Sequence, residues 1–217
     1  MILHHVPGSR SLRVLWLIEE LGLDCELRLW SLTDGSLRSP EFRALSPAGR
    51  IPALETDGRA IFESGAILQY LTEREGRLAP PPGDPERADF LEWMHFSETQ
   101  ACILQALNIH HIFLRPESAR SIPLMRLDTK RLAVTARALD KHLTGRQTLL
   151  SAFSAADCMQ GFNIEAVFRF LPAADYPALA AYRDRMTARP AYRRALARAG
   201  GDAIYEHDFY EVPDATG

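Results

Sequence analysis

A proline-rich segment near the middle of the chain is the feature that most constrains its fold. Four of the 14 prolines fall within residues 79–85, Ala-Pro-Pro-Pro-Gly-Asp-Pro. Neither a helix nor a central strand continues through such a segment, because proline lacks a backbone N–H and its ring fixes φ. Strand-like and helical patterns alternate before it, whereas helical periodicity dominates after it. The sequence therefore predicts two domains, residues 1–78 and 86–217, joined by a linker of residues 79–85.

The first predicted domain alternates strands with helices. Apolar alternation and turn signals predict strands at residues 2–5, 25–29, 53–56 and 60–62. The predicted helices are residues 11–21, a short helix that follows Ser39 as N-cap with Pro40 at its first position, and residues 64–75. The strand–helix–strand order implies a right-handed parallel crossover, and Asp57-Gly58 predicts an antiparallel hairpin. We therefore expect an α/β domain of order βαβ, short helix, ββα, with helices on both faces of a mixed sheet.

The second predicted domain is all-α. Residues from Phe90 to Leu104 place Trp93, Met94 and other apolar side chains at helical spacing. Further helices are predicted at Pro123–Leu143, Ala155–Leu171, Pro177–Ala188 and Ala191–Ala199. Ser154 and Asp157 fit a capping box, so we interpret this pair as a folding element rather than a site.

Composition and charge exclude several classes of partner. The chain has 25 basic and 28 acidic residues, a formal net charge of −3, and its arginines are scattered, so nucleic acid is not an expected partner. The longest uncharged stretch, residues 99–114, is broken by Gln, Asn and His, so no membrane span is expected. Residues 1–12 lack the basic flank and continuous apolar core of a secretion signal.

The three cysteines are isolated in sequence. Cys25, Cys102 and Cys158 form no CxxC pair and no disulfide framework, which favours a reducing, cytoplasmic location. Cys25 alternates with Leu27 and Leu29 on what should be a buried strand face, and the other two cysteines fall within apolar helices. We expect all three to be packing residues rather than nucleophiles.

Several short motifs occur in a family-specific order. They are His5–Val14 (HVPGSRSLRV), Ser46–Leu54 (SPAGRIPAL), Phe62–Ile67 (FESGAI), Ser154–Asp157 (SAAD) and Arg189–Tyr192 (RPAY). Together these motifs span nearly the whole chain. With them in this order, the chain resembles a serine-type, bacterial-like member of the cytosolic glutathione transferases. The resemblance implies a thioredoxin-like first domain that holds glutathione, a helical second domain that shapes the acceptor pocket, and a homodimer.

The Ile51-Pro52 step precedes a predicted strand. The resemblance implies a cis bond at Pro52, which would turn the backbone of Ile51 outward to pair with a bound tripeptide by strand addition. The alternative is an ordinary trans proline at the start of an edge strand.

Glu63-Ser64 lies where a strand passes into a helix, and a helix N-terminus with its unpaired N–H groups favours an anion. The resemblance implies that Ser64 binds the γ-glutamyl carboxylate of glutathione and that Glu63 or a neighbour receives its ammonium. The alternative reading of Ser64 is a simple N-cap.

Glutathione reacts as a thiolate, so its thiol needs a group that stabilises the anion. The resemblance places this hydroxyl at Ser9, four residues before Arg13, with Ser11 as the runner-up; a turn or capping role is the alternative for Ser9. Residues 2–8 contain no Tyr and the segment contains no Cys. Tyrosine-type and cysteine-type mechanisms are therefore disfavoured, as are deglutathionylating activities that use an enzyme thiolate. Arg50, ranked above Arg10, is a candidate for the sulfur or the glycine carboxylate.

The expected function is conjugation of glutathione to hydrophobic electrophiles, a detoxification reaction. Glutathione is then a co-substrate, and no prosthetic group or metal is expected, because the side chains of the adjacent pairs His4-His5 and His110-His111 diverge. A non-catalytic binding protein of the same fold is one alternative. Another glutathione-dependent reaction, such as isomerisation, peroxide reduction or dehalogenation, is the other.

Overall fold

The computed structural model describes residues 1–200 and 204–212, which pack as two compact units. Residues 1–90 pack with the segment that starts at Thr187, and residues 91–186 pack with the segment that starts at Tyr205. The last helix, α8 (Pro190–Ala199), therefore belongs with the N-terminal sheet by packing although it is distant in sequence, and it lies against α1 (Ser11–Leu21). The division of the chain into domains 1–78 and 86–217 at the linker of residues 79–85 stays a prediction.

The first unit contains a four-stranded sheet in the order β2-β1-β3-β4. Its strands are β1 (Ile2–His5), β2 (Glu26–Leu29), β3 (Ala53–Thr56) and β4 (Arg59–Phe62). β1 runs parallel to β2 and antiparallel to β3, and β3 pairs antiparallel with β4, so the predicted crossover and hairpin are both confirmed. The hairpin turn has positive φ at Asp57 and Gly58, as a two-residue turn of this type requires.

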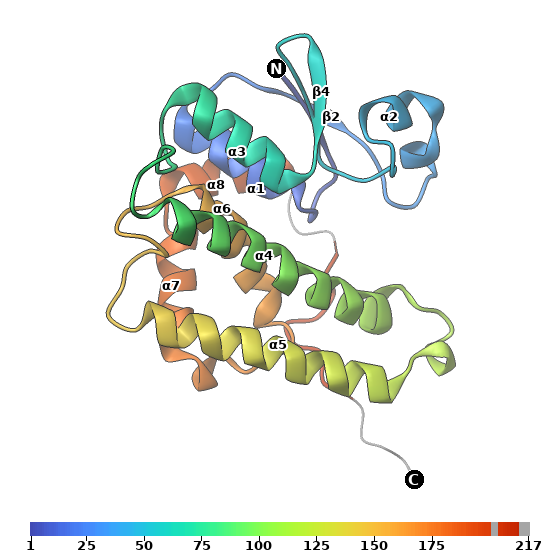
Figure 1. Cartoon of the computed structure of the whole chain (residues 1–217). Coiled ribbons are helices and arrows are strands. Elements are labelled where there is room, and N and C mark those ends of the chain that lie inside the picture. Colours follow the sequence, from blue (N-terminus) through green and yellow to red (C-terminus); the bar gives the residue numbers. More distant parts are fainter. Residues whose placement is uncertain (201–203, 213–217) are drawn as a thin grey trace. The chain divides into compact units, whose positions relative to one another are not determined.

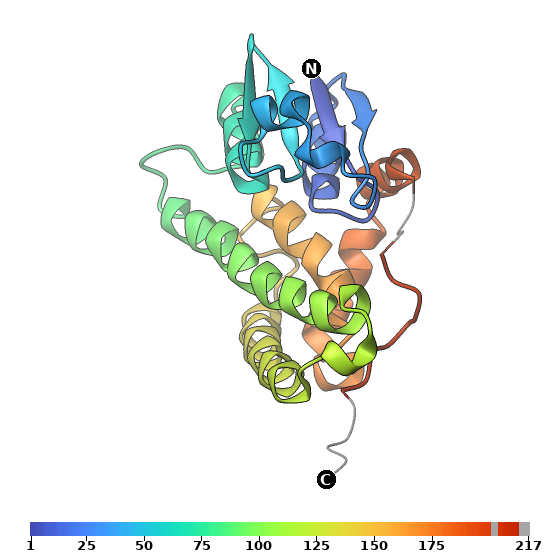
Figure 2. The same cartoon turned by 90° about the vertical axis from the view of Figure 1, so that its right-hand side faces the viewer.

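Helices cover both faces of this sheet, as predicted. α1 and α3 (Ser64–Glu75) pack against each other, and the short helix α2 (Pro40–Leu45) packs against β3 and β4 (Figure 1). In the turned view α2 lies in front of the strands (Figure 2). The Ser39 hydroxyl accepts a hydrogen bond from the Phe42 N–H, which confirms its capping role. The thioredoxin-like fold of this unit is thus established.

The exposure of β2 contradicts the expectation that Cys25, Leu27 and Leu29 lie on a buried strand face. Leu29 is 64% exposed, Cys25 lies just before the strand, and Leu27 is only half-buried, so this face is not the buried one predicted. The reason is topological, because β2 is an edge strand with β1 as its one neighbour in the sheet. Cys102 is exposed on its helix, which contradicts its expected packing role, whereas Cys158 is fully buried as predicted.

The helical part agrees with the predicted elements. Its helices are α4 (Arg87–Asn108), α5 (Ile122–Leu143), α6 (Ala155–Val167) and α7 (Pro177–Thr187), with a π-helical turn at Ile109–Phe113 and short 3₁₀ turns at Glu117–Ala119 and Ala173–Asp175. A further 3₁₀ turn, Ser36–Arg38, precedes α2. On α4 the predicted apolar stripe is buried at Phe90, Met94, Ala101 and Leu104 and half-buried at Trp93. Within the described residues, no helix is long and apolar enough to cross a membrane.

α6 ends four residues earlier than predicted. After Val167 the N–H groups of Arg169 and Phe170 bond to carbonyls three residues back, which tightens the last turn. Pro172 follows, and a proline disfavours helical geometry at the residue before it, here Leu171. At the other end, the Ser154 and Asp157 capping box is confirmed, and the buried Asp157 carboxylate also accepts bonds from the Leu149 N–H and the Tyr182 hydroxyl.

The loop before β3 depends on a glycine. Gly49 has φ +63°, and a Cβ built there would lie 2.7 Å from the Leu37 carbonyl oxygen. A left-handed conformation disfavours any residue with a Cβ, and a backbone oxygen cannot swing aside as a side chain can. Gly49 therefore sets the path of the chain into Arg50 and Ile51.

We expect Gly49→Ala to destabilise the protein more than Gly35→Ala. Gly35 also has a positive φ, +83°, but nothing lies within 4 Å of its added Cβ, so its substitution carries only the left-handed cost of about 1–2 kcal/mol. The measurement is the free energy of unfolding from denaturant titration. Equal losses in the two variants would show that the contact with Leu37 does not constrain the loop.

Candidate functional site

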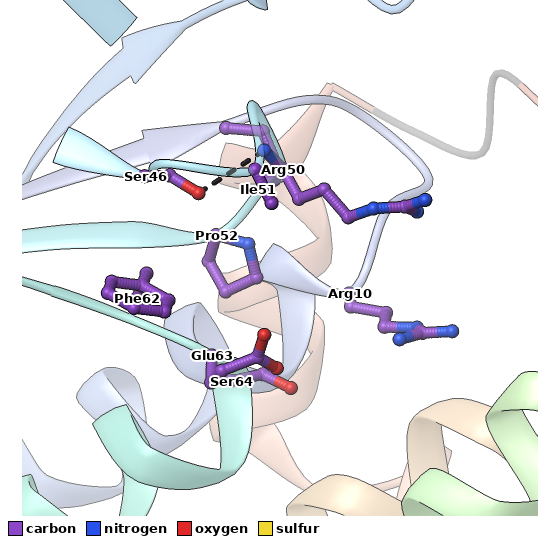
Figure 3. Close-up of a pocket in the computed structure, with 9 residues that line it drawn as sticks. Arg10, Ser46, Arg50, Ile51, Pro52, Phe62, Glu63 and Ser64 are labelled. Carbon is purple, nitrogen blue, oxygen red and sulfur yellow. Dashed lines mark hydrogen bonds between the residues drawn. The ribbon is translucent and has the colours of Figure 1, made fainter. Parts of the chain in front are cut away.

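A pocket in the first unit brings together most of the predicted glutathione-binding residues (Figure 3). Its lining residues are Arg10, Ser46, Ala48, Arg50, Ile51, Pro52, Phe62, Glu63 and Ser64. They come from the loop before α1, the loop between α2 and β3, and the junction of β4 with α3. Six positions singled out from the sequence are therefore assembled in one place, namely Arg10, Arg50, Ile51, Pro52, Glu63 and Ser64.

One wall of the pocket is the loop that leads into β3. The Ile51-Pro52 bond is cis, as the resemblance implied. The Arg50 N–H donates a hydrogen bond to Ser46 Oγ over 3.2 Å, which fastens the loop to the end of α2. The Arg50 side chain itself is exposed. In Figure 3 the side chains of Arg10 and Arg50 extend in the same direction from the pocket wall.

The opposite wall is the start of α3. Glu63 has φ 70° and ψ 118°, an uncommon conformation for a residue with a side chain, and such residues cluster at functional sites. Glu63 is the N-cap residue of α3, and its side chain makes no capping bond. The alternative reading of Ser64 as the N-cap is therefore wrong, since Ser64 is the first helical residue.

Ser64 is positioned by a buried arginine. Ser64 is 2% exposed, and its hydroxyl accepts a hydrogen bond from Arg13 Nη1 over 3.0 Å. Arg13 lies on α1 and is fully buried. Two arginines, Arg10 and Arg50, line the pocket beside one carboxylate, Glu63, and the N-terminus of α3 adds its positive dipole end. This arrangement suits a zwitterionic guest with more than one carboxylate.

The two candidate serines lie beside the pocket rather than in its lining. Ser9 is half-buried in the loop after β1 and immediately precedes Arg10, which does line the pocket. Ser11 is fully buried as the first residue of α1. Their hydroxyl oxygens are 2.6 Å apart, and the Ser11 N–H points to Ser9 Oγ over 3.3 Å.

The adjacent histidines of β1 point to different partners, as the strand geometry predicted. His4 bonds to the Glu55 carboxylate and accepts from the Trp30 indole N–H. His5 bonds to the Ser11 hydroxyl and to the carbonyl of Ala199. Burial lowers the pKa of His5 below its ordinary value, and the Ala199 bond only partly opposes this effect. Across residues 1–200 and 204–212, no group of three or more His, Cys, Asp or Glu side chains could hold a metal ion.

Some residues of the site were missed by sequence reasoning. Ser46 and Phe62 lie within the quoted motifs, but no role was inferred for either. In the sequence Arg13 only marks the spacing from Ser9, because nothing in a single sequence signals that an arginine is buried. The sequence gives no signal for the contacts of His5, because its partner Ala199 is 194 residues away along the chain.

Comparisons with known proteins agree with this architecture. The family described as glutathione S-transferase, N-terminal domain, matches residues 1–73. Glutathione S-transferase 3 of Schizosaccharomyces pombe is 30% identical over 94% of this chain and 90% of its own length. The disulfide-bond oxidoreductase YfcG of Escherichia coli is 31% identical over 91% of this chain and 94% of its own length. A sphingomonad glutathione S-transferase, solved in complex with glutathione, superposes with a TM-score of 0.79 at 30% identity, covering 92% of this chain and 99% of that one. On its thioredoxin-like sheet, its helical unit and these full-length similarities, the chain belongs to the glutathione transferase family.

Proposed function

We propose that this protein conjugates glutathione to hydrophobic electrophiles through the thiolate of bound glutathione. The observation that carries the proposal is the pocket itself, because it joins the cis Ile51-Pro52 step, the Glu63-Ser64 helix start and two arginines in one cavity. The sphingomonad relative solved with glutathione supports the choice of ligand.

The tripeptide has complementary groups along this pocket. Its γ-glutamyl carboxylate fits the N-terminus of α3 at Ser64, where helix N–H groups and the dipole favour an anion. Its ammonium fits the exposed Glu63 carboxylate, and its central backbone fits the strand edge at Ile51. Its glycine carboxylate fits the Arg50 guanidinium, with Arg10 as the second cation of the pocket.

Ser9 is our candidate for the group that stabilises the thiolate. It precedes the pocket residue Arg10 and is half-buried, whereas Ser11 is fully buried behind it. Ser9 also lies next to the N-terminus of α1, whose dipole favours an anion. An unperturbed thiol with a pKa of about 8.5 is mostly protonated at neutral pH, so this stabilisation decides how much nucleophile is present.

We expect Ser9→Ala to raise the pKa of enzyme-bound glutathione by about one unit or more, since a hydrogen bond to a charged group contributes roughly 1.5–3 kcal/mol. Glutathione affinity at low pH should change little, because the thiol is then protonated in both proteins. The rate should fall by less than the lost thiolate fraction, as a more basic thiolate is also more nucleophilic. The measurement is an ultraviolet titration of the bound thiol.

Ser11→Ala is the comparison variant for this titration, because it removes the neighbouring hydroxyl and leaves Ser9 in place. Because Ser11 is buried, we expect a much smaller shift than in Ser9→Ala. A raised pKa in Ser11→Ala with an unchanged one in Ser9→Ala would reassign the role. If neither variant shifts the titration, backbone N–H groups or Arg10 must hold the thiolate instead.

Disulfide reduction by glutathione is the second candidate, favoured by the 31% identity to a disulfide-bond oxidoreductase. Attack of bound thiolate on a disulfide needs no enzyme cysteine, which fits the absence of Cys from residues 1–24. We expect turnover with an aryl halide to exceed turnover with a small mixed disulfide at equal glutathione. The reverse order would favour the second candidate, and failure of the protein to bind immobilised glutathione would favour a non-catalytic role.

We further propose that two copies form a homodimer, as the family resemblance implies for the helices α3 and α4. A stable interface typically buries about 1,200–2,000 Å², enough to persist at micromolar dilution. Light scattering should give the mass of two chains. The mass of a single chain would contradict the proposal.

A further inference from the structure

A chain of hydrogen bonds runs inward from the candidate serine. Ser9 Oγ lies 2.6 Å from Ser11 Oγ, and Ser11 Oγ lies 2.7 Å from His5 Nδ1. His5 Nε2 lies 2.9 Å from the Ala199 carbonyl oxygen. All four residues belong to the first unit, and His5 and Ser11 are fully buried.

The last link and a neutral ring together set the direction of the bonds at His5, where Nδ1 at 2.7 Å is a nearer acceptor for the Ser11 hydroxyl than the Val6 carbonyl at 3.4 Å. A carbonyl oxygen only accepts, so His5 Nε2 carries the hydrogen that is donated to Ala199. Burial lowers the pKa of His5, so the ring is neutral and its Nδ1 is an acceptor. The Ser11 hydroxyl therefore donates to Nδ1, and the Ser9 hydroxyl donates to Ser11. With its hydrogen directed inward, Ser9 offers a lone pair to a thiol that enters the pocket.

We propose that His5 is a positioning residue that receives the thiol proton of glutathione through Ser11 and Ser9. The inference rests on the proposed function. The S–H bond breaks and its proton bonds to Ser9 Oγ, while the electron pair stays on sulfur. The original Ser9 proton passes to Ser11 Oγ, and the original Ser11 proton passes to His5 Nδ1. The products are a thiolate that accepts a hydrogen bond from Ser9 and an imidazolium, with no net gain or loss of protons.

Burial of His5 disfavours the imidazolium, whereas two helix ends favour this separation of charge. The serines lie at the N-terminus of α1, where the positive dipole end stabilises a thiolate. Ala199 is the last residue of α8, where the carbonyls form the negative dipole end and stabilise an imidazolium. Both ring N–H groups of the imidazolium would keep an oxygen partner, Ser11 and Ala199.

Several charged side chains of the surrounding elements form ion pairs, whereas Arg13 of α1 is fully buried and donates to the Ser64 hydroxyl. Glu19 of α1 pairs with Arg194 and Arg198 of α8, and Glu55 of β3 pairs with His4. The thiolate and the α8 C-terminus therefore favour the imidazolium, and the positive charge of Arg13 disfavours it.

The experiment counts protons released for each thiolate formed. Glutathione binding is measured by calorimetry in two buffers of different ionisation enthalpy, and the thiolate is measured by its ultraviolet absorbance in the same samples. S-methylglutathione, which has no thiol proton, gives the protons exchanged by all other groups and is subtracted. In the native protein we expect thiolate with much less than one proton released per thiolate.

His5→Gln and His4→Gln form a matched pair, because both histidines are buried on β1 and each has two hydrogen-bond partners. In His5→Gln, the amide cannot take up a proton, so thiolate formation should release close to one proton to the buffer. His4→Gln should behave as the native protein. Ser11→Ala, which interrupts the chain and leaves the ring in place, should behave as His5→Gln and covers the case in which His5→Gln does not fold.

Three outcomes would contradict either the proton relay or the proposed function. Thiolate in the native protein with about one proton released per thiolate would overturn the relay and leave the proposed function standing. Equal proton release in His4→Gln and His5→Gln would assign the effect to general packing and also overturn the relay. No thiolate at all in the native complex would instead contradict the proposed function.

Discussion

Burial of α1 is the constraint on which the candidate site depends. Nine of its 11 residues are buried, because the helix is enclosed by β1, α3 and α8. A helix fixed in this way holds its N-terminal end in place. Its first residue, Ser11, closes the hydrogen-bonded chain to His5, and its third residue, Arg13, donates to Ser64 at the start of α3. The loop with Ser9 and the N-terminal end of α3 are therefore positioned by the same buried helix.

Much of this fold could be predicted from the sequence because its signals are local. Gly22 at the C-cap of α1, Ser39 before Pro40, and Asp57-Gly58 each specify a backbone conformation within a few residues. The pocket residues at Arg50–Pro52 and Glu63-Ser64 could be predicted as well, since they lie in short contiguous motifs. The cis bond came from resemblance, as periodicity and composition give no information about a peptide isomer.

The failures share a physical cause, which is that they depend on tertiary neighbours. The alternation of Cys25, Leu27 and Leu29 is that of a half-buried strand, but only the sheet order shows that β2 lies at the edge. Cys102 has an apolar sequence context, yet it lies on an exposed face of α4. The role of His5 depends on Ser11 and Ala199 together, and the second of these is brought near only by the packing of α8 on α1.

The two candidate reactions share one first step and differ in the second. Both require a thiolate on bound glutathione, and the geometry of the first unit bears on that step alone. In the proposed relay, the His5 imidazolium would also keep the thiol proton within the protein while the thiolate attacks. That proton could return through the same chain to a thiolate that leaves from a mixed disulfide. Substitution on an aryl halide needs no proton, and addition to an electrophilic carbon needs one at the acceptor instead. A relay that can return its proton to sulfur therefore suits disulfide reduction as well as conjugation, because in disulfide reduction both the nucleophile and the leaving group are sulfur.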